Sequence, residues 1–343
     1  MTRFVVMSDL HLHAWSYGSS IVNGRNSRLL DQVNLLAAVQ TYLDENDIHT
    51  LIFTGDYFHT HSTLRSEVLW AAHTFLSWLK EAKINITFLI GNHDYADKEG
   101  DLHSLDFFKE FGTVVEKPGF YGDLFWAMSY TEDENKLKAF LDKTPKDSIV
   151  LLHQGLSQIP VTSKGFTINE ILRPEMIPNY AAGAFVGHYH SRFKVKDRNI
   201  WSPGSPMQLT WTDTGEARGI LDVFWTPGSI DVREVDLDSP RFVELTGKDI
   251  SECENNFIRV RVSSSDDFSE IKEKVLKYGA RSCEMVTPDD RAQRLEIPSS
   301  ESFDSLPSLV SSYMDHLQLE APVRKIGEQI MGGTYAPEKA NSK

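Results

Sequence analysis

Five short segments of the sequence bring together Asp, His and Asn in the combinations that metal chemistry requires. The segments are Asp9-Leu10-His11, Gly55-Asp56 with His59, Gly91-Asn92-His93-Asp94, His153 with Gln154, and Gly187-His188-Tyr189-His190. Carboxylate and amide oxygens combined with several imidazoles suit Mn²⁺, Fe²⁺ or Zn²⁺, whereas carboxylates and water alone suit Mg²⁺ or Ca²⁺. One such segment is ordinarily surface polarity or a turn. Five of them predict a site for more than one metal ion.

The residue types also indicate separate tasks at this site. A carboxylate has two oxygens, so Asp56 is the natural ligand to bridge two cations. Consecutive residues of a turn diverge, so Asn92 can face a metal while His93 faces a substrate. A histidine oriented by a carboxylate such as Asp94 can protonate a leaving oxygen or stabilise a transition state. Two metals about 3.5–4 Å apart can activate water and stabilise both the attacking and the leaving oxygen when a phosphoester bond is displaced in line.

Apolar runs precede all five segments, which predicts that buried strands position them. The runs are residues 4–7, 51–53, 86–90, 149–152 and 184–186. Residues i and i+2 of an extended chain point to the same side, so Asp9 and His11 are expected to converge at a strand end. Open α/β folds bind ligands beyond the carboxyl ends of their strands. We therefore expect all five strand ends to meet.

The remaining pattern up to residue 238 is that of a layered α/β domain. Apolar stripes at helical spacing cover 29–43 and 64–79, and a helix is expected at 134–141. Further strands are expected at 113–115, 125–130, 219–225 and 230–235, while residues 157–180 form a connection that the pattern does not place. The first half therefore alternates strand and helix, and the second half is mostly strand.

The pattern changes near Asp238, which predicts three units: 1–238, 239–300 and 301–343. In the second unit, a strand at 258–262, a helix starting near Phe268 and a strand at 281–286 make a small α+β domain. Ser265-Asp266 is expected to cap the helix and Gly279 to end it. In the third unit, helical stripes run from Phe303 to Leu317 and from Val323 to Ile330, and we expect them either to pack on their own domain or to bind a partner.

Composition and charge narrow the class of protein. Of the 343 residues, 41% are hydrophobic and 24% charged, as in ordinary globular proteins. No run reaches the ~18–20 apolar residues of a membrane span, and two cysteines favour a reducing, cytoplasmic setting. A net charge of −14 argues against coating nucleic acid non-specifically. It does not exclude an enzyme acting on nucleic acid, because bound metals and a partner can supply positive charge.

The five motifs resemble those of the calcineurin-like metallophosphoesterase superfamily, whose pattern is Asp-x-His, Gly-Asp, Gly-Asn-His-Asp/Glu, His and Gly-His-x-His. The resemblance implies a β-sandwich flanked by helices and a two-metal hydrolase with His93 as the catalytic histidine. It also implies two overlapping sets of metal ligands, one for each divalent cation. They are Asp9, His11, Asp56 and His190 for one metal, and Asp56, Asn92, His153 and His188 for the other.

A narrower resemblance is to the nuclease subunit of SbcCD-type DNA double-strand-break repair complexes, including phage recombination endonucleases. It rests on the form Gly-Asp-x-Phe-His, in which His59 assists exonuclease action, and on Pro203-Gly204-Ser205 with Glu216 and Gly219 downstream. The third support is the order of core, cap and helical segment. The resemblance implies Mn²⁺ as the metal, with Mg²⁺, Fe²⁺ or Zn²⁺ as alternatives. It also implies a coiled-coil ABC ATPase partner, with a nuclease homodimer inside a heterotetramer that acts in DNA repair, recombination and replication. His13 departs from the family, which has Gly there.

Three functions remain open from sequence. The first is a DNA nuclease, the second a phosphatase or nucleotide phosphodiesterase, and the third a DNA-end-binding subunit without catalysis. The motifs alone do not separate the first two. The third is disfavoured because every expected ligand is present. Basic residues that follow the first and last motifs are candidate DNA contacts, namely Arg25, Arg28, Arg192 and Lys194. A solvated hairpin explains the two after the last motif equally well.

Overall fold

Two six-stranded sheets form the centre of the computed structural model, which describes residues 1–61, 63–96, 102–157, 170–246, 252–263 and 267–287. The first sheet has the order β14-β13-β1-β4-β5-β6. Its strands are β1 (Thr2–Met7), β4 (Thr50–Phe53), β5 (Asn85–Leu89), β6 (Gly112–Val115), β13 (Gly219–Thr226) and β14 (Ser229–Asp236). The neighbours β1, β4, β5 and β6 are parallel, so their carboxyl ends share one edge.

The second sheet has the order β11-β12-β10-β9-β8-β7. Its strands are β7 (Gly119–Tyr121), β8 (Phe125–Met128), β9 (Ile149–His153), β10 (Gly183–Gly187), β11 (Phe193–Lys194) and β12 (Ile200–Ser202). Strands β8, β9, β10 and β12 are parallel, so His153 and the residues after Gly187 lie at one edge of this sheet.

Alternating side chains show that the two sheets face each other. Phe4 and Val6 of β1 join Ile149 and Leu151 of β9 in one buried cluster between the sheets. The intervening residues point outward to clusters under the helices, as Val5 does in β1. Every strand that carries a site motif is therefore covered on both faces, which explains its nearly unbroken apolar run.

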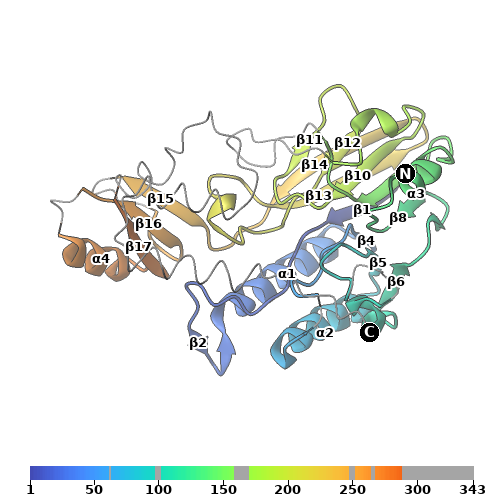
Figure 1. Cartoon of the computed structure of the whole chain (residues 1–343). Helices are drawn as coiled ribbons and strands as arrows, with labels where there is room; N and C mark the ends of the chain where they lie inside the picture. The colour runs from blue at the N-terminus through green and yellow to red at the C-terminus, as the bar shows by residue number, and fades with distance from the viewer. Residues whose placement is uncertain (62, 97–101, 158–169, 247–251, 264–266, 288–343) are drawn as a thin grey trace, which may run out of the picture.

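Helices cover the outer faces of both sheets (Figure 1). Helices α1 (Ser27–Glu45) and α2 (Ser66–Glu81) pack on the first sheet, and α3 (Glu134–Leu141) packs on the second. The Asn26 side chain accepts hydrogen bonds from the backbone of Arg28 and Leu29, and so caps α1. The predicted β-sandwich flanked by helices is confirmed. Short elements complete this part: β2 (Ile21–Val22), β3 (Arg25–Asn26), η1 (Ser104–Phe108), η2 (Pro174–Met176) and η3 (Trp211–Asp213).

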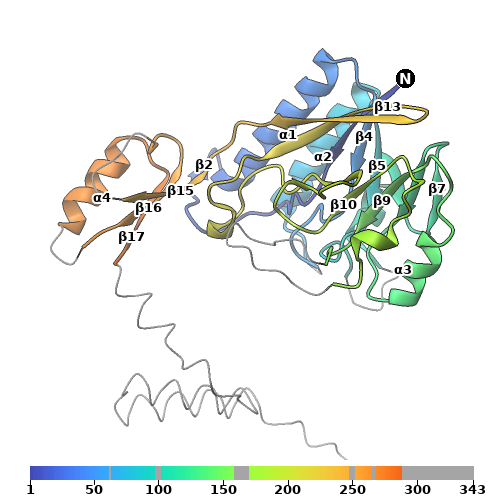
Figure 2. The ribbon, with the colours of Figure 1, turned by 90° about the horizontal axis from the view of Figure 1, so that it is seen from above.

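A small α+β unit lies at one end of the core, next to β2 (Figures 1 and 2). Its parallel sheet has the order β15-β16-β17, with strands β15 (Phe242–Thr246), β16 (Phe257–Arg261) and β17 (Ser282–Val286). Helix α4 (Phe268–Lys277) joins β16 to β17. The N-cap residue of α4 is Asp267, whose side chain accepts hydrogen bonds from the backbone N–H groups of Ser269 and Glu270, rather than the predicted Ser265-Asp266 pair. We call residues 239–287 the cap.

Specific contacts hold the cap against the core. The Arg28 guanidinium is buried, lies within 5.5 Å of the ring centroids of Trp15, Phe242 and Phe257, and donates to the Leu209 carbonyl. Arg281 of the cap forms two hydrogen bonds with Asp31 of α1, at 2.8 and 3.1 Å. The interface therefore includes a charge pair and an enclosed cation, both anchored at the start of α1.

The predicted elements agree with the structure to within a few residues, whereas strands β2, β3, β7, β11, β12 and β15 are absent from the prediction. The boundary at residue 238 falls between β14 and β15, and the division into three units stays a prediction. Residues 288–343 lie outside the described part of the chain, and with them the predicted helices from Phe303 onward.

Candidate metal centre

The seven predicted ligand side chains lie close together at the shared edge of the two sheets. Two groups of three predicted ligands have ligand atoms within 4.8 Å of one another, namely Asp9 with His11 and His190, and Asp56 with His153 and His188. A further such group joins His11 with His59 and His93. The Asn92 Oδ1 atom lies 3.2 Å from His153 Nε2 and 3.0 Å from His188 Nδ1, and so joins the second group. The five strand ends therefore meet.

Asp56 lies between the two groups. Its Oδ2 atom is 3.5 Å from His11 Nε2, and its Oδ1 atom is 3.4 Å from His153 Nε2. Each carboxylate oxygen thus faces a different group, which is the arrangement that a bridging ligand needs. The mixture of imidazole, carboxylate and amide donors fits two divalent transition-metal ions.

The backbone is strained at four of these ligands. Asp9, His11 and Asp56 have φ of 49°, 46° and 56°, and His188 has φ of 106°. Side-chain-bearing residues rarely adopt such angles, which cost roughly 1–3 kcal/mol each and gather at functional sites. The prediction that an extended chain brings Asp9 and His11 together is therefore wrong in its geometry. Strand β1 ends at Met7, and a left-handed turn aims both side chains.

Glycines beside the ligands leave room for them. A Cβ atom on Gly91 would lie 2.1 Å from Asp56 Oδ1, and one on Gly55 would lie 2.2 Å from His153 Nδ1. A Cβ atom on Gly187 would meet Ser8 Oγ and the Thr54 carbonyl at 2.3 Å. The Gly in three of the motifs is thus required by close packing around the ligand atoms.

Burial and mutual charge set the protonation of the site. Burial lowers the pKa of His188 to about 4 and holds the pKa of His11 well below its usual value. Burial alone would raise the pKa of Asp56, but the neighbouring histidines, His153 foremost, hold it below its usual range. At these three groups the result is neutral imidazoles and an ionised carboxylate, the forms that bind metal. At His153 burial is outweighed by the charge of Asp56, which raises the pKa to about 9, so a metal must displace a proton there.

His93 lies next to both groups without belonging to either. Its ring is edge-to-face with that of His11, at 4.8 Å between centroids, and its Nδ1 donates to the His59 carbonyl at 2.8 Å. Its backbone N–H donates to Asp56 Oδ1 at 2.9 Å. The Nδ1 contact leaves Nε2 as the nitrogen able to exchange a proton with a substrate oxygen.

Contrary to the prediction, Asp94 does not contact the His93 ring. It is fully buried, and its oxygens accept backbone hydrogen bonds from Tyr57, Phe58 and Gly91 at 3.0–3.2 Å. It therefore ties the turn after β4 to the turn after β5, and the expected orienting role falls to the His59 carbonyl. Burial raises the pKa of Asp94 to about 7.

His59 lies in a group of aromatic rings beside the metal ligands. Its ring centroid is 5.5 Å from that of His93 in a stacked arrangement, and 5.4 Å from that of His11. The Trp15 and His13 rings lie 4.3 and 5.1 Å away on other sides. Burial, and after it the charge of His13, lowers the pKa of His59 to about 4. The structure thus places His13 against His59 and gives it no position within either ligand group.

The four predicted DNA contacts do not form one surface. Arg28 is enclosed under the cap, and the Arg192 side chain is 7% exposed and paired with Glu234 and Asp236. Arg25 lies over the Trp70 ring, and Lys194 is exposed beside the Trp201 ring. Neither enclosed guanidinium is presented to solvent.

Three residues near the ligands were not predicted to be there. Asp213 lies 3.4 Å from His190 Nδ1, the Tyr130 ring stacks 6.1 Å from that of His188, and the His61 ring stacks 4.8 Å from that of His93. None of them stands at a motif spacing, so only the fold brings them to the site.

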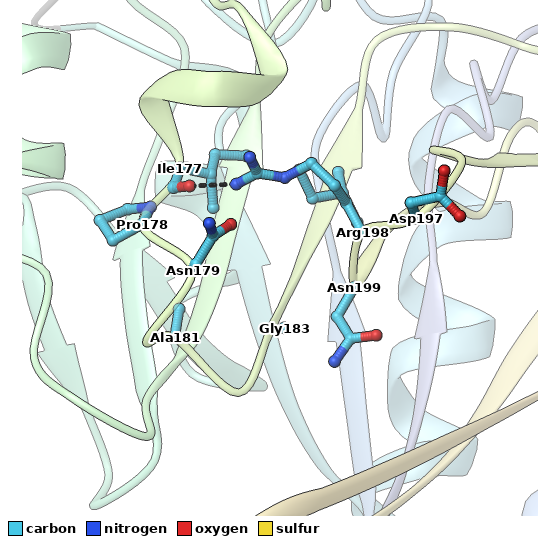
Figure 3. Close-up of a pocket in the computed structure, with 9 residues that line it drawn as sticks. Ile177, Pro178, Asn179, Ala181, Gly183, Asp197, Arg198 and Asn199 are labelled. Atoms are coloured by element: carbon cyan, nitrogen blue, oxygen red, sulfur yellow. Dashed lines mark hydrogen bonds between the residues drawn. The ribbon is translucent and has the colours of Figure 1, made fainter.

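A cavity of about 290 Å³ lies away from this centre (Figure 3). It is lined by Gly183 at the start of β10, whereas the predicted ligand His188 follows the end of that strand, roughly 15 Å farther along. Figure 3 shows the Arg198 guanidinium donating to the Ile177 carbonyl. This cavity contains none of the predicted ligands.

A family model described as calcineurin-like phosphoesterase matches residues 2–192. The match covers more than half of the 343 residues, so the chain belongs to the calcineurin-like phosphoesterase family. Members of this family use two divalent metals, and the two ligand groups fit that requirement. Among the described residues, no helix is both long enough and apolar enough to cross a bilayer.

Three solved structures are similar to this chain. A dimetal phosphatase from Danio rerio is 12% identical with a TM-score of 0.41, and the match covers 68% of this chain and 95% of that one. Nuclease MPE from Pseudomonas putida is 16% identical with a TM-score of 0.31, covering 64% and 83%. GAP50, the anchor in the inner membrane complex of Plasmodium, is 12% identical with a TM-score of 0.33, covering 84% and 98%. Scores this low support no conclusion about function.

Proposed function

We propose that the protein is a metal-dependent DNA nuclease of the SbcCD type, hydrolysing phosphodiester bonds as an exonuclease and an endonuclease. The observation that carries the proposal is His59, the last residue of Gly55-Asp56-Tyr57-Phe58-His59. The superfamily motifs do not require this histidine, yet it stacks on His93 and its carbonyl fixes the His93 ring. An extra imidazole beside the proposed catalytic histidine supplies a second polar contact for a substrate longer than a phosphomonoester.

Each residue of the site has a task in this proposal. The ligands Asp9, His11, Asp56, Asn92, His153, His188 and His190 hold two divalent ions, with Mn²⁺ as the proposed metal. When bound, such ions activate water and neutralise the phosphoester oxygens. His93 faces the substrate and delivers a proton to the leaving oxygen, or stabilises the charge that develops there. His59 holds the His93 ring through its carbonyl and presents its own imidazole on the same side.

The test compares substrates with the full chain and Mn²⁺ alone. We expect labelled linear duplex DNA to be degraded from its ends and single-stranded circles to be cut, with little hydrolysis of p-nitrophenyl phosphate. His59→Ala should slow release from duplex ends by at least tenfold and affect cutting of circles less. His49→Ala is the matched control, because that imidazole is exposed and pairs with Asp47. Efficient phosphomonoester hydrolysis with intact DNA would instead identify a phosphatase.

We further propose that residues 301–343 bind the base of a coiled-coil ABC ATPase, with two nuclease chains in a heterotetramer. The support is the sequence pattern, since this segment lies outside the described residues. Short helices in isolation are marginal in water, so the stripes of Phe303–Leu317 and Val323–Ile330 need a surface to bury against. Each large apolar side chain buried adds ~1.5–3 kcal/mol.

Truncation after Ser299 tests this partner proposal. We expect binding to the purified ATPase to weaken more than tenfold, because at least two buried anchors are removed. Mn²⁺-dependent cleavage by the isolated chain should survive. If the truncated chain unfolds, the stripes belong to the core of this protein, and the docking proposal fails.

A further inference from the structure

The segment η3 lies between one ligand group of the metal centre and the cap. Asp213, its last residue, contacts His190, and Trp211, its first residue, contacts the cap. Only one residue, Thr212, therefore separates a contact with a proposed metal ligand from a contact with another structural unit. Neither residue belongs to a recognised motif.

Asp213 is held rigidly in its position beside His190. Its side chain is 4% exposed, and its Oδ2 accepts from the backbone N–H groups of Leu209 and Thr210, each at 2.9 Å. Its Oδ1 is 3.3 Å from Arg218 Nη2 and 3.4 Å from His190 Nδ1. One oxygen is thus anchored to the backbone, and the other is aimed at the imidazole.

The opposite nitrogen of the same ring faces the metal centre. His190 Nε2 lies 3.1 Å from His11 Nε2. A carboxylate on one ring nitrogen holds the proton there and leaves the other nitrogen free as a metal ligand, while fixing the orientation of the ring. His190 needs such a fixture, because its side chain is 33% exposed and is the least enclosed of its ligand group.

The Pro-Gly-Ser segment supports His190 from its backbone side. Ser205 N donates to the His190 carbonyl at 2.9 Å, and a Cβ atom on Gly204 would lie 2.5 Å from that carbonyl. Arg218 contacts both Ser205 Oγ and Asp213, so the two supports are joined. This packing gives a physical reason for the Pro203-Gly204-Ser205 sequence.

The cap closes the other side of the segment. The Arg259 guanidinium of β16 lies 3.9 Å from the Trp211 ring centroid, and the Phe242 ring of β15 meets Trp211 edge-on at 4.9 Å. The backbone N–H of Phe242 donates to Gln208 Oε1 at 2.7 Å. Arg259 itself is held by Glu244 and Glu284 of the neighbouring strands.

We propose that Asp213 is a positioning residue for the metal ligand His190, and that the cap sets the affinity of that metal by holding Trp211. The inference rests on the proposed assignment of His190 as a ligand. It predicts that the two metals respond unequally, since Asp213 contacts a ligand of one group only. A change in the cap should therefore reach the metal centre through the three residues of η3.

The test is calorimetric titration of the full metal-free chain with Mn²⁺. We expect two sites in the unmodified protein, and Asp213→Asn should weaken one of them by about 10–100-fold and leave the other within threefold. The visible spectrum of the Co²⁺ form should change at one site only. Equal weakening of both sites would overturn the proposal, because it would reflect a general loss of structure. No weakening would overturn it as well, because Asp213 would then not support His190.

A second pair of variants tests the cap without touching the site. Arg259→Gln removes the cation over Trp211, whereas Arg261→Gln is the matched control on the same strand and pairs with the same Glu244. We expect Arg259→Gln to weaken the same single site by at least threefold and Arg261→Gln to leave it unchanged. If the two variants bind Mn²⁺ equally, the proposed coupling is wrong. This comparison remains decisive even if Asp213→Asn does not fold.

The ligand assignment has its own readout in the same experiment. Fewer than two Mn²⁺ sites in the unmodified chain, or two unchanged sites in His190→Ala, would refute the proposed metal assignment. Selective loss in His190→Ala together with unchanged binding in Asp213→Asn would refute only the inference about Asp213. The two failures are therefore distinguishable.

Discussion

Replacing Asp56 with Ala is expected to remove both metals from the protein. Its two oxygens face different ligand groups, His11 on one side and His153 on the other. Loss of this carboxylate also leaves several imidazoles facing one another without a central negative charge. We expect the affinity for Mn²⁺ to fall at both sites by more than about a hundredfold, beyond the range seen when an outer carboxylate is lost. Elemental analysis and calorimetric titration measure this directly.

Asp222→Ala is the matched control for this variant. Asp222 is also a buried carboxylate, but it pairs with Arg3 and Tyr42 near the start of β1, away from the ligands. Its loss should lower the melting temperature without changing metal content. Two tightly held metals in Asp56→Ala would show that the carboxylate does not bridge, and loss of metal in Asp222→Ala would show that general stability governs the measurement.

The clustering of the seven predicted ligand residues could be predicted because the sequence marks strand ends clearly. Strands covered on both faces must be apolar throughout, so an Asp, Asn or His directly after such a run stands out. The parallel order of β1, β4 and β5 then follows from the alternation of strand and helix, and brings the marked ends to one edge. Pattern and topology together therefore locate the centre.

The local backbone at the ligands could not be predicted in the same way. Left-handed φ angles at Asp9, His11 and Asp56 are strained, and no residue preference announces them. They persist because surrounding contacts fix the turns, including the three backbone hydrogen bonds that Asp94 accepts. The sequence shows Asp94 next to His93 and so suggests a contact with it, whereas the fold assigns it to backbone groups 36 and 37 residues away.

Residues outside the motifs were missed for a different reason. Asp213 lies in a segment between strands with no periodicity, and its distance of 23 residues from His190 matches no ligand spacing. The position of Arg28 after the first motif suggests a DNA contact, yet the aromatic rings of the core and cap enclose it. The enclosure of Arg28 depends on where the cap sits, and the contact of Asp213 depends on how the segment after β12 returns to His190, neither of which the sequence specifies.

His93→Ala is expected to retain both metals and to lose nearly all hydrolysis. The His93 ring touches His11 and can group with His11 and His59, but its Nδ1 is committed to the His59 carbonyl, and neither of the two predicted ligand groups includes it. Proton transfer by a positioned histidine contributes about 10²–10⁴-fold, or ~3–5 kcal/mol of transition-state stabilisation. We therefore expect kcat to fall by that factor while KM for DNA changes little. Single-turnover cleavage with Mn²⁺, beside elemental analysis of the same preparation, separates these quantities.

His73→Ala provides the comparison for this experiment. His73 is an exposed imidazole of α2 that contacts Phe111 and Ser77, so its removal changes the histidine count and leaves the centre intact. We expect its kcat within twofold of the unmodified protein. If His93→Ala loses metal in proportion to activity, His93 acts as a ligand, and the proton must come from elsewhere. One alternative proton donor is His59, whose ring is stacked 5.5 Å away, and His59→Ala would then keep its metals and show the loss of kcat instead.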